Sequence, residues 1–277
     1  MSAFDLFTQI RMKRSYLCVG LDPDYALIPD SLKKSPDALF EFNKRIVDAT
    51  APFAVAYKPN LAFYEVHGVT GWVNLKKTAE YIKEKYPSIF LIADAKRGDI
   101  GNTAAKYAAA FFRQMPFDAI TLAPYMGEDS ITPFLKYPGK WAIMLALTSN
   151  PGAADFQFME DKYSGLRTFE RVLDFSKRWG NEDNMMYVVG ATKPEMFEAV
   201  RRLVPNHFLL VPGVGAQGGS LREVSRVGLN SQCGLLVNSS RAIIHADSSD
   251  TFDQTARQKA EEIQKEMDEL LQQRYLI

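Results

Sequence analysis

Short runs of apolar and β-branched residues recur along the chain, and amphipathic stretches separate most of them. The runs are too short, and too closely flanked by turn residues, to be helices. They are typical of parallel strands that are buried on both faces. The predicted strands cover 16–21, 53–58, 89–95, 119–123, 141–147, 186–191, 208–213 and 234–239.

The amphipathic stretches repeat apolar residues at the spacing of a helix. Helices are expected over 37–50, 72–86, 165–179 and 195–204, with a short one in 1–16 and a last one from Thr251 to Gln273. Strands that alternate with helices over about 250 residues are typical of a (β/α)8 TIM barrel. We therefore predict an α/β fold, with one barrel domain over 1–277 and an added helix at each end. A doubly wound open sheet is the alternative.

Composition narrows the function classes. Of 277 residues, 47% are apolar and 24% are charged, which is enough apolar surface for a folded core. Lys plus Arg and Asp plus Glu both number 33, and this balance argues against a nucleic-acid binder that relies on a basic surface. No apolar run approaches the ~20 residues that span a bilayer, and the N-terminus has no signal-peptide core, so no membrane partner is expected.

Cysteine and histidine usage suggests neither a disulfide framework nor a zinc site. Cys18 and Cys233 lie in apolar strand-like runs and are expected to be small buried side chains. The histidines His67, His207 and His245 are scattered and have no partner at ligand spacing. We expect a cytoplasmic protein, in a compartment that keeps thiols reduced.

Charged residues follow three successive strands. Asp22 ends the first, Lys58 the second, and Asp94 and Lys96 the third. Barrel enzymes carry their chemistry at this end of the strands. Asp94 and Lys96 are two apart, so they project to the same side of a strand, and Asp99 follows in the turn before the next helix. A solvated cluster of salt bridges is the simpler alternative, but burial at a strand end opposes it, because buried charges need partners.

The chemistry of this cluster favours proton donation. Carboxylates that flank Lys96 favour its ammonium form. An ammonium is a poor Schiff-base nucleophile, since that role needs a neutral amine, but it suits protonation of a carbanion-like centre.

A second candidate site follows the last two strands. Residues 213–218 fit G-x-G-x-x-G, but too little chain remains after Arg241 for a dinucleotide-binding domain, and the next strand ends without the expected acidic residue. Barrels often bind phosphate with the loops after strands seven and eight. The glycine-rich turn and Arg241 therefore predict a phosphate site.

The segment DAKRGDIGNTA (94–104) resembles the D-x-K-x-x-D-I signature of the orotidine 5′-phosphate decarboxylase family. LCVGLDPD, AVAYKPN, PGVGAQGG and NSSRAI resemble further blocks of that family in the same order, in its longer bacterial-type branch. The resemblance implies a (β/α)8 homodimer with no metal and no organic cofactor. It also implies conversion of orotidine 5′-phosphate (OMP) to uridine 5′-phosphate (UMP) and CO2 in de novo pyrimidine biosynthesis.

The resemblance further implies a role for individual residues. The catalytic set is Lys58, Asp94, Lys96 and Asp99: Lys96 protonates C6 of the pyrimidine as CO2 leaves, and Asp94 lies beside the departing carboxylate. Asp99, Ile100 and Thr103 come from the partner subunit. Asp22 and Lys58 hold ribose hydroxyls, Ser149 contacts the pyrimidine, and Gln217 and Arg241 bind the phosphate, with Pro212 and Gly215 in the same loop region. Ser240 departs from the pattern, because a glycine often precedes the arginine.

Two other functions remain open. Mg²⁺-dependent keto-sugar phosphate decarboxylases and hexulose phosphate synthases share the D-x-K-x-x-D core, but they carry an acidic metal ligand where this chain has Lys58. A phosphate-binding barrel without catalysis is the other, although binding alone would not need both Asp94 and Lys96. Two segments are predicted lids: the loop 213–219 and the stretch 150–165.

Overall fold

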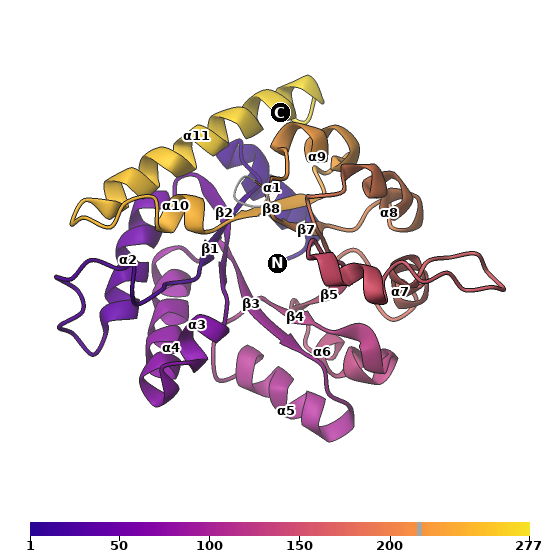
Figure 1. Ribbon diagram of the computed structural model, residues 1–277, viewed down its shortest axis with the longest axis horizontal. Coiled ribbons are helices and arrows are strands. Elements are labelled where there is room, and N and C mark those ends of the chain that lie inside the picture. Colours follow the sequence, from indigo (N-terminus) through magenta and orange to yellow (C-terminus); the bar gives the residue numbers. More distant parts are fainter. Residues whose placement is uncertain (215–217) are drawn as a thin grey trace.

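A computed structural model describes residues 1–214 and 218–277 of the chain (Figure 1). Within these residues, all strand pairs are parallel and close into a barrel in the order β1 to β8. The predicted (β/α)8 fold is confirmed, and the open-sheet alternative is wrong. The strands are β1 (Leu17–Leu21), β2 (Ala54–Pro59), β3 (Phe90–Arg97), β4 (Ala119–Leu122), β5 (Trp141–Leu147), β6 (Met185–Val189), β7 (Leu209–Pro212) and β8 (Leu235–Ser239).

Helices surround the barrel as an outer layer, as Figure 1 shows. Their apolar faces pack on strands that are therefore buried on both sides, which explains the continuous apolar runs. The helices are α1 (Ala3–Lys13), α2 (Ala38–Thr50), α3 (Ala62–Glu65), α4 (Gly68–Lys85), α5 (Gly101–Phe112), α6 (Thr132–Leu135), α7 (Thr168–Ser176), α8 (Phe197–Leu203), α9 (Leu221–Gly228), α10 (Arg241–Ile244) and α11 (Phe252–Gln273), with short 3-10 turns η1 (Pro124–Met126), η2 (Glu128–Ser130), η3 (Pro151–Asp155) and η4 (Pro194–Met196).

One helix is shorter than its sequence pattern predicts. The amphipathic stretch 165–179 forms α7 only from Thr168 to Ser176. Gly165 adopts a positive φ of 67°, and Arg167 caps the helix by pairing with Glu170, so the residues before Thr168 belong to a turn. The last predicted helix agrees with α11 within one residue.

The two added helices pack on the barrel at different places. At the amino end of the strands, Lys13 of α1 donates hydrogen bonds to the carbonyls of Ala51 and Ala54. Beside α1, Trp141 at the start of β5 donates to the carbonyl of Met1. The long helix α11 lies along one edge of the molecule beside α2 and α10 (Figure 1).

The expectation of two buried, unpaired cysteines is confirmed, since Cys18 and Cys233 are both fully buried and free. Among the described residues, no helix has the length and apolar character to cross a membrane.

Candidate active site

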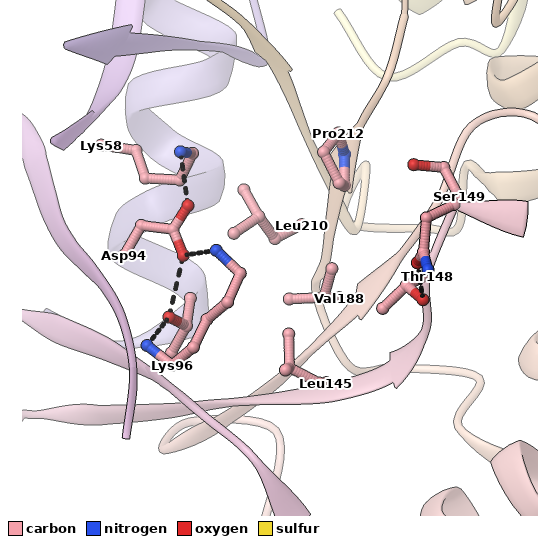
Figure 2. A pocket seen from close by; sticks show the side chains of 11 residues that line it. Lys58, Asp94, Lys96, Leu145, Thr148, Ser149, Val188, Leu210 and Pro212 are labelled. Carbon is pink, nitrogen blue, oxygen red and sulfur yellow. Dashed lines mark hydrogen bonds and ion pairs between the residues drawn. The ribbon is translucent and has the colours of Figure 1, made fainter. Parts of the chain in front are cut away.

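A cavity of ≈ 240 Å³ opens at the carboxyl end of the barrel strands (Figure 2). One wall carries the charged side chains of Lys58, Asp94 and Lys96, from β2 and β3. Across from them, Figure 2 shows an apolar wall that comes from β5, β6 and β7. The cavity is lined by Lys58, Asp94, Lys96, Thr121, Leu145, Thr148, Ser149, Asn150, Val188, Leu210 and Pro212.

The Asp94 carboxylate is the centre of the charged wall. Its Oδ2 accepts a hydrogen bond from Lys58 Nζ at 2.8 Å. Its Oδ1 accepts from Lys96 Nζ at 2.6 Å and from the hydroxyl of Thr121 at 3.0 Å. The two lysines therefore bind different oxygens of one carboxylate, and Asp94 and Lys96 meet on the same side of β3, as their spacing predicts.

Within the described residues of one subunit, the Asp94 carboxylate lies between the ammonium groups of Lys58 and Lys96. The expected arrangement, with Lys96 between two carboxylates, does not occur there. Asp99, the expected second carboxylate beside Lys96, accepts a hydrogen bond from the backbone N–H of Ile100 at 2.8 Å. Ile100 is half exposed and Thr103 is exposed on the first turn of α5. Asp99, Ile100 and Thr103 are absent from the described residues that line the cavity of their own subunit.

The ion pairs set the protonation states of the buried groups. Burial by itself raises the pKa of Asp94, but the charges of Lys58 and Lys96 and their hydrogen bonds outweigh it, so the pKa lies well below its ordinary range. Burial by itself lowers the pKa of Lys58, but Asp22 and Asp94 outweigh it and leave the pKa above its ordinary value. Asp94 is thus an anion and Lys58 a cation throughout the neutral range.

Lys96 lies in an irregular part of β3. Its φ of 46° is in the left-handed region, which side chains other than glycine adopt at a cost of roughly 1–3 kcal/mol. Ala93 pairs with Ile120 and Arg97 with Leu122, so the register between β3 and β4 shifts around Lys96. Such irregularities occur next to functional sites, and here the irregular stretch carries Lys96, whose Nζ binds Asp94 Oδ1.

Asp22 lies where β1 ends, next to the loop after β8. Its Oδ2 accepts a hydrogen bond from Ser240 Oγ at 2.7 Å, and its Oδ1 accepts from the backbone N–H of Asn60 at 3.2 Å. Ser240, the residue that departs from the family pattern, thus holds the carboxylate of Asp22. Its neighbour Gly20 has no room for a side chain, because a Cβ there would lie 2.6 Å from Ser240 Cβ.

The predicted phosphate end is described in part. Arg241 begins α10 and lines a second cavity with Asp22, Asp24, Leu27, Phe63 and His245. Pro212 ends β7 and lines the main cavity. The predicted ligands Gly215 and Gln217 lie outside the described residues. Since Asp22 also acts electrostatically on Lys58, the Arg241 cavity lies next to the charged wall.

Comparison with known proteins decides the family. A sequence model described as "Orotidine 5'-phosphate decarboxylase / HUMPS family" matches residues 15–252. The chain belongs to this family. The resemblance stated from the D-x-K-x-x-D-I segment is therefore confirmed.

Named relatives of this decarboxylase family match nearly the whole chain. The orotidine 5′-phosphate decarboxylase of Phocaeicola vulgatus is 59% identical over 271 residues, which is 98% of this chain and 99% of the relative. That of Bacteroides fragilis is 60% identical, over 98% of each chain. Among solved structures, the OMP decarboxylase of Leishmania donovani aligns with a TM-score of 0.84 and 37% identity, covering 98% of this chain and 99% of the other.

The family description also names the HUMPS group, so the charged wall is compared with the Mg²⁺-dependent alternative. Lys58 contacts Asp94 Oδ2, and Lys96 contacts the other oxygen, so both sides of the carboxylate face a cation. Among the described residues, no three His, Cys, Asp or Glu side chains are grouped to hold a metal ion. A dication at Asp94 would meet the positive charges of both lysines.

Four polar residues at or next to the site were not predicted from the sequence: Asn60, Thr121, Thr148 and Gln157. Thr121 bonds to Asp94, Asn60 bonds to Asp22, and Gln157 both accepts from Thr148 N and donates to Thr148 Oγ1, each at 2.8 Å. Thr121 had one visible signal, a hydroxyl inside the otherwise apolar run AITLA. Gln157 lies in the predicted lid 150–165 and joins that segment to the end of β5.

Proposed function

We propose that this protein is an orotidine 5′-phosphate decarboxylase that converts OMP to UMP and CO2 without a metal or an organic cofactor. One observation carries the proposal: in a barrel of this family, the Lys58–Asp94–Lys96 array faces an apolar wall across a single cavity. This arrangement suits a substrate that loses a charged carboxylate and gains a proton at the same carbon.

The chemistry places the proton donor at Lys96. When the bond between C6 and the carboxylate breaks, the electron pair stays on C6, which has no adjacent electron sink. An ammonium fixed nearby stabilises this charge and then transfers its proton to C6, after which solvent reprotonates the amine. Asp94 anchors Lys96 Nζ at 2.6 Å and so fixes the donor before the substrate arrives.

The opposing walls favour the product CO2 over the substrate carboxylate. Asp94 is an anion, so a carboxylate beside it is repelled, and this repulsion disappears when neutral CO2 forms. Leu145, Val188 and Leu210 line the cavity and offer an apolar surface to the leaving CO2. Both effects act in the direction of decarboxylation.

Remote parts of OMP supply binding energy. Arg241, Gln217, Pro212 and Gly215 bind the phosphate, Asp22 and Lys58 hold ribose hydroxyls, and Ser149 contacts the pyrimidine. The energy gained from the phosphate, far from C6, is available to close a lid and exclude water from the reacting carbon. The stretch 150–165 is a second lid, anchored at Gln157.

The active unit is a homodimer with shared sites. Asp99, Ile100 and Thr103 of each subunit complete the site of its partner, which accounts for the exposure of Ile100 and Thr103 on their own subunit. The whole chain, 1–277, acts as one barrel domain, because α1 and α11 pack on the barrel.

The proposed location is the cytoplasm, a compartment that keeps thiols reduced, and the two free cysteines agree with it.

The decisive experiment incubates the purified protein with OMP in the presence of EDTA and follows the loss of the orotate chromophore. The protein is produced in cells that lack their own enzyme, and Lys96→Ala from the same preparation controls for contamination. Full turnover with EDTA is expected. No turnover would contradict the function, and turnover that EDTA abolishes and Mg²⁺ restores would contradict the metal-free reaction.

A further inference from the structure

The pairing of β3 with β4 is uneven at the charged wall. Ala93 pairs with Ile120 and Arg97 with Leu122, so three residues of β3, 94–96, lie opposite the single residue Thr121 of β4. Ordinary strand pairing matches residues one to one, and an excess on one strand leaves backbone groups without their usual partners. The bulge contains both Asp94 and Lys96, so the backbone at these two residues needs hydrogen bonds other than those of regular strand pairing.

The side chain of Thr121 bridges this bulge. Its Oγ1 accepts a hydrogen bond from the backbone N–H of Lys96 at 2.9 Å and donates one to Asp94 Oδ1 at 3.0 Å. A hydroxyl has one proton, so the two bonds use it once as acceptor and once as donor. Thr121 is 1% exposed although it lines the cavity, so both bonds are largely shielded from water.

We propose that Thr121 is a positioning residue for the proton transfer, a role that rests on the proposed decarboxylase function. Its hydroxyl holds the Lys96 backbone in the left-handed conformation and fixes the Asp94 oxygen that binds Lys96 Nζ. One atom thus sets both the origin of the Lys96 side chain and the anchor of its ammonium group. Thr121 does not act on the substrate; it acts through Lys96 and Asp94.

Two substitutions of Thr121 distinguish a positioning role of its hydroxyl group from a role in packing. Valine has nearly the shape of threonine but neither donates nor accepts, so Thr121→Val removes both bonds and keeps the volume. Serine keeps the hydroxyl and removes a methyl group. If Thr121 acts by packing alone, valine should be the better substitute; if it acts through its hydroxyl, serine should be.

The experiment measures kcat, KM, UMP affinity and thermal stability for both variants and wild type. Thr121→Val is expected to lower kcat about 100-fold, the scale of a misplacement of about 1 Å, with UMP affinity unchanged. Thr121→Ser is expected to recover most of kcat. The control is Thr78→Val, which removes an equally buried hydroxyl that bonds to Asn74 in α4, away from the cavity. It should lose stability and keep kcat.

Two kinetic outcomes would overturn the proposal: Thr121→Val that keeps at least half of wild-type kcat, or Thr121→Ser that is as impaired as Thr121→Val. If Thr121→Val does not fold, Thr121→Cys replaces it, because a thiol is a weak donor and acceptor, and the same loss of kcat is expected.

A crystal structure of the variant gives a readout independent of turnover. In Thr121→Val, Lys96 is expected to leave its positive φ, or its Nζ to leave Asp94 Oδ1. Unchanged geometry would overturn the positioning role. Absence of turnover in wild type would instead contradict the proposed function, and the crystal structures would still decide the role of Thr121.

Discussion

Lys58 and Asp94 form an ion pair of 2.8 Å at the carboxyl ends of β2 and β3, with only 6% and 10% of their side chains exposed. The removal of two charges from water costs free energy. The attraction between Lys58 and Asp94 offsets that cost, so both groups remain charged. Lys58 thereby keeps Asp94 ionised, and Asp94 in turn anchors Lys96. The pair thus holds in place Lys96, the proposed proton donor.

Replacement of Lys58 by methionine should raise the pKa of Asp94. Burial raises the pKa of Asp94, and in this variant only Lys96 opposes that effect. The carboxyl of Asp94 therefore takes up a proton at higher pH. The acid limb of the kcat profile should therefore move to higher pH. The free energy of unfolding should fall by up to about 3 kcal/mol, the lower end for a broken buried pair, because Lys96 still faces Asp94.

These changes are measured by pH–rate profiles and by urea unfolding at neutral pH. Lys76→Met, in an exposed pair with Glu80, is the matched control and should alter neither quantity appreciably. An acid limb that does not move in Lys58→Met would refute the role of this pair in keeping Asp94 ionised.

Lys96→Ala should remove turnover while UMP still binds. The variant lacks the proposed proton donor but retains Arg241, Asp22 and Ser149, the residues proposed to make the remote contacts. A loss of at least 1000-fold in kcat is expected, within the roughly 10²–10⁴-fold that a positioned acid contributes. Single-turnover assays measure the rate, and titration calorimetry measures UMP affinity. Near-normal activity would exclude Lys96 as the donor.

Asp99 is tested by mixing inactive chains. If each site uses Asp99 of the partner subunit, a dimer of one Lys96→Ala chain and one Asp99→Ala chain contains one site with both residues intact. Mixed dimers should recover up to about half of the activity per dimer, as the geometry of two shared sites requires. Differently tagged chains, purified as mixed dimers, give the measurement. No recovery in such dimers would place Asp99 in its own subunit's site.

His207 should make the fold sensitive to acid. It is 8% exposed, and neither ring nitrogen has a hydrogen-bond partner within the described part of the chain. Burial lowers the pKa of His207; Glu182 opposes this and Arg201 adds to it. In the unfolded chain the pKa of histidine is about 6.5. At pH values between the folded pKa and this unfolded pKa, the unfolded chain binds more protons than the folded chain. The free energy of unfolding is therefore highest above a pH of about 6.5 and falls as the pH decreases below it.

His207→Phe should therefore flatten the decline in thermal stability between pH 7 and pH 5. At pH 8 wild-type His207 is neutral in both states, so this effect is absent there. Scanning calorimetry across this range measures the slope. An equally steep decline in the variant would assign the acid sensitivity to other groups.

The alternation of strands and helices could be predicted because it depends on local periodicity. Apolar runs mark strands covered on both faces, and the 3.6-residue repeat marks the helices that cover them. The meeting of Asp94 and Lys96 could be predicted for the same reason, since residues two apart share one face of a strand. Their pairing with Lys58 needed only the barrel rule that strand ends converge.

The contacts between distant segments could not be predicted in this way. Thr121 meets Asp94 and Lys96 because the register between β3 and β4 shifts at that point, and Ser240 meets Asp22 because β8 closes the barrel onto β1. The length of α7 likewise depended on the turn at Gly165.

The sequence by itself determined the fold class and the charged residues at the strand ends, because periodicity and local spacing are properties of neighbouring residues, and its motifs carried the resemblance to the family. Only the tertiary structure decided the backbone conformation of Lys96, the hydroxyl that holds it, and the order of charges around Asp94. Strand register and barrel closure arise from packing among segments far apart in the chain, and no local pattern encodes them.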